Sequence, residues 1–155
     1  MAEPLPKAHS NELWQHALAP NNLGYKVKLA SQLMYRDFLG RLEPYGLTPF
    51  HYLVLCCLWE EDGLSTTGIA DKLKQLGATL TGVVDRMEDR SLVYRERDPG
   101  DRRIIRIWLT DEGRQLMYVL PAIGAQTIDE ATLDIPKAQQ EAFVRLLDQI
   151  IANLL

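Results

Sequence analysis

Apolar residues recur at helical spacing in the first third of this chain. The steps between them are four, three, four and four, in the series Leu23, Val27, Ala30, Met34 and Phe38. This period predicts an amphipathic helix that continues to about Leu42, where Glu43-Pro44-Tyr45-Gly46 ends it. Ahead of it, Ser10 can cap a short helix that Pro20 ends, whereas residues 1–9 contain two prolines and no apolar period and are expected to be a mobile arm.

Two further helices have clear start signals. Thr48 is placed as an N-cap, Pro49 occupies the first turn that follows, and Asp62-Gly63 ends this helix. Ser65 is placed as the cap of a third, shorter helix. The inward residues of that helix are Ile69, Leu73 and Leu76.

The next helix, which Gly77 introduces, is predicted from Ala78 to about Arg90 and has two distinct faces. One face is apolar: Leu80, Val83, Val84 and Met87. The other is small or polar: Thr79, Thr81, Gly82, Asp85, Arg86 and Asp89. Residues 92–97 and 104–109 follow as predicted strands, joined by a turn and by the adjacent Arg102 and Arg103. Helix, helix and hairpin is the order of a winged helix-turn-helix, which holds DNA with one helix in the major groove and a cationic hairpin beside it.

The last third of the chain is predicted to be helical. Thr110 caps a helix that begins Asp111-Glu112-Gly113 and that Pro121 is expected to bend. A final helix begins near Pro136, and its apolar stripe reaches the last residues: Phe143, Leu146, Leu147, Ile150, Ile151 and Leu154. A helix this apolar needs a partner, and a second copy of the chain is the simplest one. The fold class is therefore mainly α with a small β-wing.

Length and composition narrow the class of protein. The 155 residues fit one domain, or one compact core with a helical extension, and need no disulfide or metal to fold. Cys56 and Cys57 are adjacent, so they form no ordinary disulfide, and their apolar setting fits a reducing cytoplasm. No apolar run is long enough to span a membrane, and residues 1–7 lack a signal core, so we expect a soluble, cytoplasmic protein.

The charge distribution favours DNA more than the total does. The net charge is −4, but residues 72–106 hold nine Lys or Arg against six Asp or Glu, a local +3 that leaves −7 for the remainder. Phosphate binding depends on local counterion release, so the local excess is the relevant quantity.

Several motifs follow one another in order between Leu47 and Leu116. They are Leu47-Thr48-Pro49, Ile69-Ala70 to Leu73, Thr79-Leu80-Thr81, Val84 to Glu88, Leu92-Val93, Arg97-Asp98-Pro99, Asp101-Arg102-Arg103, and Leu109-Thr110 to Gly113. On these motifs the segment resembles the MarR family of bacterial transcription regulators. The Asp-Arg-Arg wing followed by Leu-Thr and Gly113 is the most specific part, whereas the flanking helices match in layout only.

The resemblance implies a triangular homodimer whose first and last helices form the interface and whose two lobes grip a pseudo-palindrome. It also implies that a small aromatic acid, a drug or an oxidant releases the DNA. The chain departs from the family pattern at two positions. Gly82 stands where many relatives place a polar or basic residue, so one contact is missing or has moved to the backbone, and His51 replaces a frequent glutamine.

The residues expected to bind DNA lie at two helix starts, along the predicted recognition helix and in the wing. They are Ser65, Thr66, Ala78, Thr79, Thr81, Gly82, Arg86, Arg102 and Arg103. Arg103 is the first choice for the minor groove, with Asp101 orienting it. The alternatives are ordinary early-turn helix positions for Thr79 and Thr81, plain helix capping at Ser65 and Thr66, an intrachain pair of Arg86 with Asp98 or Asp101, and solubility charge for Arg102 and Arg103. Arg90 and Arg95 are expected to contribute general electrostatics rather than sequence readout.

An effector site and an enzymatic site have weaker support. Tyr35, Phe38, His51 and Tyr118 are the expected effector contacts, against ordinary roles in the core or in a helix cap. Cys56 and Cys57 fit core packing better than redox sensing. No histidine has metal-ligand spacing, and no phosphate-binding loop or hydrolytic triad is present, so neither a metal, a cofactor nor an enzyme is expected.

The sequence therefore predicts a ligand-responsive repressor that binds double-stranded DNA as a homodimer and responds to a small aromatic or phenolic effector. Residues 1–20 form an arm and a short helix, residues 21–46 and 111–155 form the dimerisation region, and residues 47–110 form the DNA-binding lobe. The alternative is a winged-helix module for protein interaction or structure that binds no specific DNA.

Overall fold

The structure is a computed structural model that describes residues 22–74 and 77–155. The predicted arm, the short helix before Pro20 and the inward position of Leu76 lie outside these residues. The elements follow in the order α2 (Leu23–Leu42), η2 (Glu43–Tyr45), α3 (Pro49–Glu60), β1 (Leu64–Ser65), α4 (Thr66–Leu73), α5 (Gly77–Asp89), β2 (Val93–Arg97), β3 (Ile105–Leu109), α6 (Asp111–Gln115), η3 (Leu116–Tyr118), α7 (Leu120–Ala131) and α8 (Lys137–Leu154).

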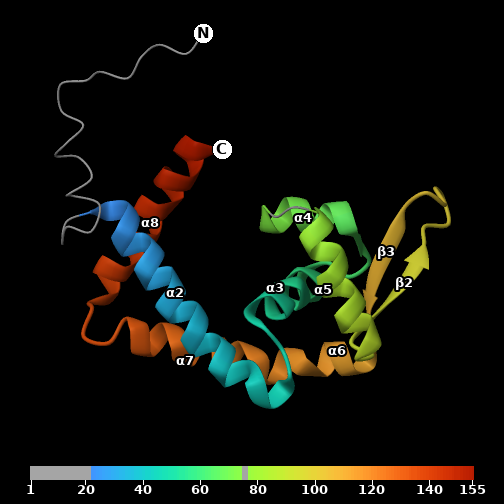
Figure 1. Cartoon of the computed structure of the whole chain (residues 1–155), viewed down its shortest axis with the longest axis horizontal. Coiled ribbons are helices and arrows are strands. Elements are labelled where there is room, and N and C mark those ends of the chain that lie inside the picture. The colour runs from blue at the N-terminus through green and yellow to red at the C-terminus, as the bar shows by residue number, and fades with distance from the viewer. Residues whose placement is uncertain (1–21, 75–76) are drawn as a thin grey trace, which may run out of the picture.

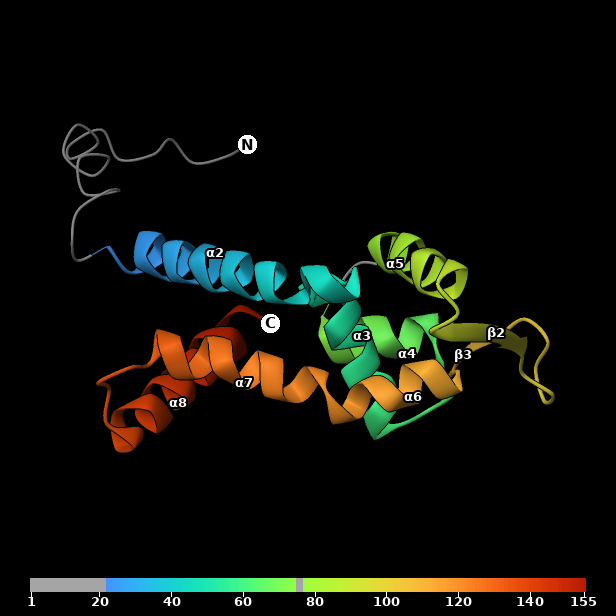
Figure 2. The same cartoon turned by 90° about the horizontal axis from the view of Figure 1, so that it is seen from below.

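The elements gather into two groups that the views in Figures 1 and 2 both separate. α3, α4, α5 and the hairpin of β2 and β3 form a lobe, from which the hairpin projects. α2, α7 and α8 lie together on the other side. The chain thus combines a mainly helical body with a small β-wing, and the predicted winged helix-turn-helix is confirmed.

The predicted caps fix the helix starts of the lobe. The side chains of Thr48, Ser65 and Thr110 each accept a hydrogen bond from the backbone N–H three residues later, which satisfies a donor that the helix leaves free. Apolar residues from α3, α4, α5 and the strands then fill one core, whose largest fully buried members include Leu55, Leu58, Ile69, Leu80, Met87 and Ile107. This core holds α5 by its apolar face.

The sheet has one strand more than the sequence indicates. β3 lies between β2 and β1, and both neighbours are antiparallel to it. β1 contains only Leu64 and Ser65, which pair with Ile107 and Arg106. Two residues are too few to show an alternating pattern, so only the pairing with β3 reveals this strand.

The helix predicted from Asp111 is divided rather than bent at Pro121. α6 ends at Gln115, a 3₁₀ segment covers Leu116–Tyr118, and α7 begins at Leu120. Pro121 lies in the first turn of α7, where its missing N–H removes no helical hydrogen bond. The interruption of the α-helix therefore lies in η3, ahead of the proline. Gly113 in α6 is needed for close packing, because a Cβ there would lie 2.2 Å from the carbonyl oxygen of Leu92.

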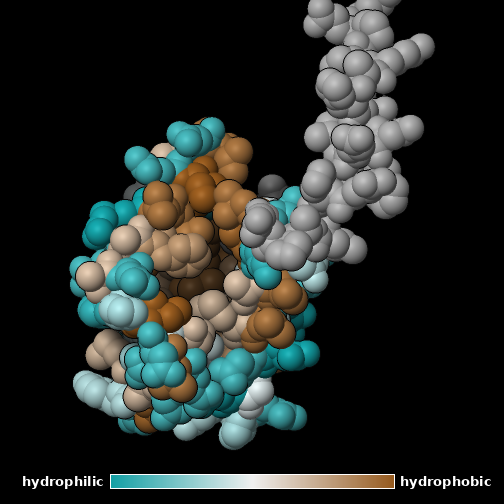
Figure 3. Space-filling view, turned by 90° about the vertical axis from the view of Figure 1, so that its left-hand side faces the viewer, coloured by the Kyte–Doolittle hydropathy of each residue, from teal (hydrophilic) through white to brown (hydrophobic). Residues whose placement is uncertain are grey.

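α2 and α7 pack against each other through a polar network at their crossing. Thr127 is buried and donates to Asp37 over 2.7 Å, while Arg41 pairs with Asp37 at 2.8 Å and with Glu130 at 2.6 Å. α8 contains no buried residue. Figure 3 shows the result, a hollowed face with many apolar side chains. Within the described residues, no helix combines the length and hydropathy needed to cross a membrane.

Candidate DNA-binding surface

α5 presents its polar face to solvent because its apolar face fills the core. Leu80, Val83, Val84 and Met87 are buried, whereas Thr79, Thr81, Asp85, Arg86 and Asp89 are exposed. Gly82 lies half-buried among the exposed residues. Ala78 belongs to α5, but its side chain is not among those that the structure describes. The face predicted from the sequence is therefore available to a partner over most of the helix.

Arg86, the exposed arginine of α5, pairs with neither Asp98 nor Asp101, the two partners that the sequence suggested for it. Within the described residues Arg86 forms no ion pair, because Asp98 binds Arg106 and Asp101 binds Arg103. The positive charges of Arg86 and Arg90 also reach His51, where burial is the main cause that lowers the pKa of the imidazole and these two charges add to it. Among the residues that the structure describes, Arg86 is thus a cation without an ion-pair partner, and it lies near the start of α3.

The tip of the wing is held by two aspartates. Asp98 Oδ1 accepts from the backbone N–H groups of Gly100 and Asp101 at 2.8 and 2.9 Å, and its other oxygen binds the guanidinium of Arg106. The hydrogen bond from Arg106, and then those from the two backbone N–H groups, lower the pKa of Asp98. The turn between β2 and β3 is therefore fixed by an ionised carboxylate.

Asp101 orients Arg103 in the manner that the sequence predicts. Its carboxylate accepts from Arg103 Nε at 2.9 Å and from Nη2 at 2.7 Å, and this bond is the main cause that lowers the pKa of Asp101. The Arg103 side chain is nevertheless 90% exposed. Arg102 is exposed as well, and its carbonyl accepts from Arg97 Nη1 at 3.0 Å. The wing thus holds one oriented arginine, with a second beside it.

Arg90 and Arg95 form specific hydrogen bonds and ion pairs within the chain, in addition to the general positive charge that the sequence predicts for them. Arg90 donates to the carbonyl oxygens of Gly46 and, at 2.6 Å, of Tyr45, which ties the end of α5 to the loop after α2. Arg95 of β2 binds Glu88 and, at 2.5 Å, Asp85. This second contact holds the wing against α5 and neutralises a carboxylate on its exposed face.

The start of α4 shows the capping interaction proposed as the alternative role of Ser65. Ser65 Oγ accepts from Gly68 N at 3.0 Å, and Ser65 also belongs to β1. Thr66 begins the helix and is half-buried. A phosphate contact through the backbone of these residues stays a prediction.

The four predicted effector residues have different surroundings. Phe38 packs edge-on against Tyr52, with ring centroids 5.1 Å apart. His51 is buried, and its Nδ1 accepts from Thr48 N at 3.0 Å, as in a capping box. Tyr35 is exposed on α2, and Tyr118 is 81% exposed in η3.

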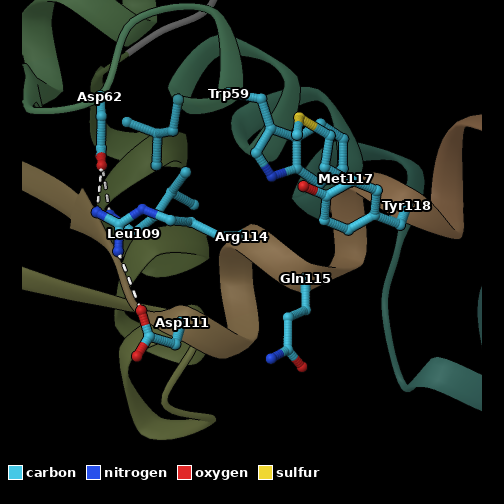
Figure 4. Close-up of a pocket in the computed structure, with 9 residues that line it drawn as sticks. Trp59, Asp62, Leu109, Asp111, Arg114, Gln115, Met117 and Tyr118 are labelled. Carbon is cyan, nitrogen blue, oxygen red and sulfur yellow. Dashed lines mark hydrogen bonds and ion pairs between the residues drawn. The ribbon is translucent and has the colours of Figure 1, made fainter.

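Tyr118 lines a cavity of about 450 Å³ beside η3 (Figure 4). Trp59 lines it from α3 and donates through Nε1 to the carbonyl of Gly113 at 2.9 Å. Arg114 lies toward the other end, between Asp62 at 2.8 Å and Asp111 at 3.4 Å. The sequence did not reveal Trp59 and Arg114 as neighbours because they are far apart in the chain.

The cysteines have the surroundings of packed side chains. Cys57 is buried and Cys56 half-buried, and burial is the main cause that raises the pKa of both thiols. A raised pKa lowers the thiolate fraction on which reactivity depends. In the ranges 22–74 and 77–155, no group of three His, Cys, Asp or Glu side chains could hold a metal ion.

Comparisons with known proteins agree with this geometry. A sequence model described as the MarR family matches residues 47–105. The HTH-type transcriptional regulator TtmR of Methylorubrum extorquens is 36% identical over 137 residues, which cover 86% of this chain and 69% of that protein.

Solved structures of DNA-binding regulators are similar over nearly the whole chain. The transcriptional repressor CouR bound to a 23-mer DNA duplex is 30% identical, with a TM-score of 0.79 over 96% of this chain and 99% of that one. BpsR of Bordetella bronchiseptica, whose DNA binding is regulated by 6-hydroxynicotinic acid, is 26% identical, with a TM-score of 0.79 over 84% of this chain and 93% of that one.

Proposed function

Because this chain belongs to the MarR family of transcriptional regulators, we propose that it represses transcription by binding a pseudo-palindromic DNA operator as a homodimer. The observation that carries the proposal is the pairing of an exposed α5 face with an oriented Arg103 on the adjacent wing. α5 enters the major groove, where Thr79, Thr81 and Arg86 meet bases or phosphates. Arg103 enters the flanking minor groove, where the negative potential is concentrated.

Residues 47–110 form the DNA-binding lobe, and residues 21–46 and 111–155 form the dimer interface. Leu23, Phe143, Leu146 and Leu154 are exposed apolar residues of the helices concerned, and a second copy would bury them. A two-fold dimer presents two α5 helices, which must lie about 34–36 Å apart to meet successive half-sites. The interface therefore sets the affinity for DNA.

A small aromatic or phenolic effector binds the cavity beside η3. Trp59 and Tyr118 supply aromatic surfaces for stacking, and Arg114, which is paired with Asp62 and Asp111, offers its remaining N–H donors to an acidic group. The regulation of BpsR by 6-hydroxynicotinic acid, itself a small aromatic acid, supports this chemical class. The cavity joins α3 of the lobe to the segment that leads into α7, so an occupant can change the separation of the lobes. The effector weakens DNA binding only as far as it binds the protein with altered lobe spacing more tightly than the protein with DNA-binding spacing.

Removal of the Arg103 side chain tests the proposal. We expect Arg103→Ala to weaken binding more than tenfold, because the variant loses an oriented minor-groove contact, while the dimer persists. The probe is a duplex that the wild-type protein enriches from a randomised palindromic library, and binding is measured by fluorescence anisotropy at fixed salt.

Lys72→Ala is the matched control, since it also removes one exposed, ion-paired cation but does so on α4, where Lys72 pairs with Glu60. We expect it to retain wild-type affinity. Equal affinities of the wild type and Arg103→Ala would remove the wing from the mechanism. A wild-type protein that enriches no duplex would support the non-DNA winged-helix module instead.

A further inference from the structure

Gly82 occupies the middle of the exposed face of α5. Its neighbours one turn away on the helix surface are Ala78 and Thr79 on one side and Asp85 and Arg86 on the other. This position faces the DNA if the proposed function is correct, and the inference below rests on that function.

The fold of the chain does not require glycine at this position. Gly82 has a helical backbone, whereas the described glycines with positive φ are Gly46 and Gly63. A Cβ built on Gly82 meets no atom within 4 Å, in contrast to one built on Gly113. Glycine is also the least favourable residue inside a helix after proline. The folded chain alone therefore gives no reason for glycine here, and a partner that approaches the helix closely would supply one.

The side chains around Gly82 leave room for such an approach. Thr79 and Thr81 are short, and the hydroxyl of Thr81 donates to the carbonyl of Gly77 at 3.2 Å, so it lies back along the helix. The carboxylate of Asp85 is drawn toward the wing by Arg95 at 2.5 Å. Among the described side chains of this face, the first long cation is Arg86, one turn beyond Gly82. The helix backbone can therefore come closer to a partner at Gly82 than at its neighbours with side chains.

The chemistry of the position limits what it can recognise. The N–H and C=O groups of a residue inside an α-helix are bonded within the helix, so Gly82 offers only a small C–H surface. The apolar group on base edges in the major groove is the C5 methyl of thymine. We propose that α5 lies closest to the bases at Gly82, and that Gly82 selects by shape a base pair whose thymine methyl packs against its backbone.

The variant Gly82→Ala separates this role from folding. We expect its melting temperature to rise by about 2–4 °C, because alanine is the better helix residue and has space. We expect its affinity for the duplex enriched by the wild-type protein to fall roughly fivefold or more, because the added methyl occupies the space of the thymine methyl. Ser91→Gly is the control for a gain in stability: Ser91 is exposed in the turn after α5 and has a φ of 56°, where glycine is the less strained residue, so this variant should gain stability and keep its affinity.

Replacement of each thymine of the duplex by deoxyuridine identifies the base pair. For the wild-type protein we expect a loss at one position in each half-site, and for Gly82→Ala that same replacement should cost nothing or restore binding. Wild-type affinity of Gly82→Ala, or equal deoxyuridine effects in both proteins at every position, would overturn the inference and leave the proposed function standing. A wild-type protein that enriches no duplex would overturn both.

Discussion

At the residue scale, the wing arginine combines exposure with a fixed direction. Arg103 has a largely exposed side chain, yet two of its nitrogens bind the carboxylate of Asp101. An exposed ion pair of this kind contributes little to folding stability. Its consequence is instead that the guanidinium loses less side-chain freedom when it enters a groove, because Asp101 has already limited its conformations.

The charge-neutralising variant Asp101→Ala distinguishes orientation from net charge. It makes the wing more positive by one charge, so an account based on charge alone predicts tighter DNA binding. We expect binding about three- to tenfold weaker, because Arg103 loses its partner and must be ordered on binding. Fluorescence anisotropy at fixed salt measures the change. Asp89→Ala, which removes an exposed carboxylate from the end of α5, is the comparison and should tighten binding slightly; a similar gain for Asp101→Ala would refute the orienting role.

At the element scale, the start of α3 depends on a histidine where a capping box usually has glutamine or glutamate. Thr48 Oγ1 accepts from His51 N at 3.3 Å, and His51 Nδ1 accepts from Thr48 N at 3.0 Å. Accepting this bond requires a ring nitrogen without a proton. Burial, together with the charges of Arg86 and Arg90, lowers the pKa of His51 and keeps it neutral. The helix that supports α5 is therefore sensitive to pH at its first turn.

The stability of the protein should fall as the pH drops below about 6.5, because burial lowers the pKa of His51 in the folded state. Above pH 6.5 the His51 imidazole is neutral in both the folded and the unfolded chain, so the stability that its hydrogen bond from Thr48 N contributes is fully present. Below 6.5 the unfolded chain takes up a proton that the folded chain resists, so the free energy of unfolding falls, by at most about 1.4 kcal/mol for each pH unit. His51→Gln keeps the accepting group without the titration. Urea unfolding at several pH values should show a smaller loss for this variant, and parallel losses in both proteins would exclude His51 as the cause.

At the scale of the whole molecule, the polar network at the α2–α7 crossing and the exposed apolar face of α8 have different consequences. Asp37, Arg41 and Thr127 join α2 to α7 within one chain. Phe143 and Val144 of α8 line an apolar groove with Met34 of α2 and Ile128 of α7. This groove is the surface that the proposed dimer covers, so the dimer and the spacing of the two lobes depend on the same helices.

A charge placed in this groove should separate the subunits. We expect Phe143→Glu to be monomeric at micromolar concentration by light scattering, because dimer formation would bury the new carboxylate. Its affinity for the selected duplex should fall more than tenfold, since one lobe then binds without the other. Gln149→Glu adds the same charge to an exposed position of α8 and is the control. A dimeric Phe143→Glu, or a wild-type protein that is monomeric at this concentration, would contradict the proposed interface.

The features that sequence predicted well depend on residues close together in the chain. Thr48, Ser65 and Thr110 form their caps within three residues, and Asp101 and Arg103 are two residues apart. The features that it missed join distant residues. Arg90 binds a loop 44 residues earlier, and Trp59 donates to a carbonyl 54 residues later. The position of η3 was also missed, because Pro121 marks the start of α7 but not where α6 ends.

The sequence by itself determined the order of the elements, the caps, the apolar face of α5 and the charged tip of the wing. Each of these follows from hydrogen bonds and side-chain periods within a few residues, which the chain carries wherever it folds. The tertiary structure decided which cations are free: it ties Arg90 and Arg95 to partners on other elements and leaves Arg86 unpaired among the described residues. It also showed that Gly82 has open space around it and that Trp59, Arg114 and Tyr118 share one cavity. These properties depend on how distant segments pack, and no local pattern encodes that packing.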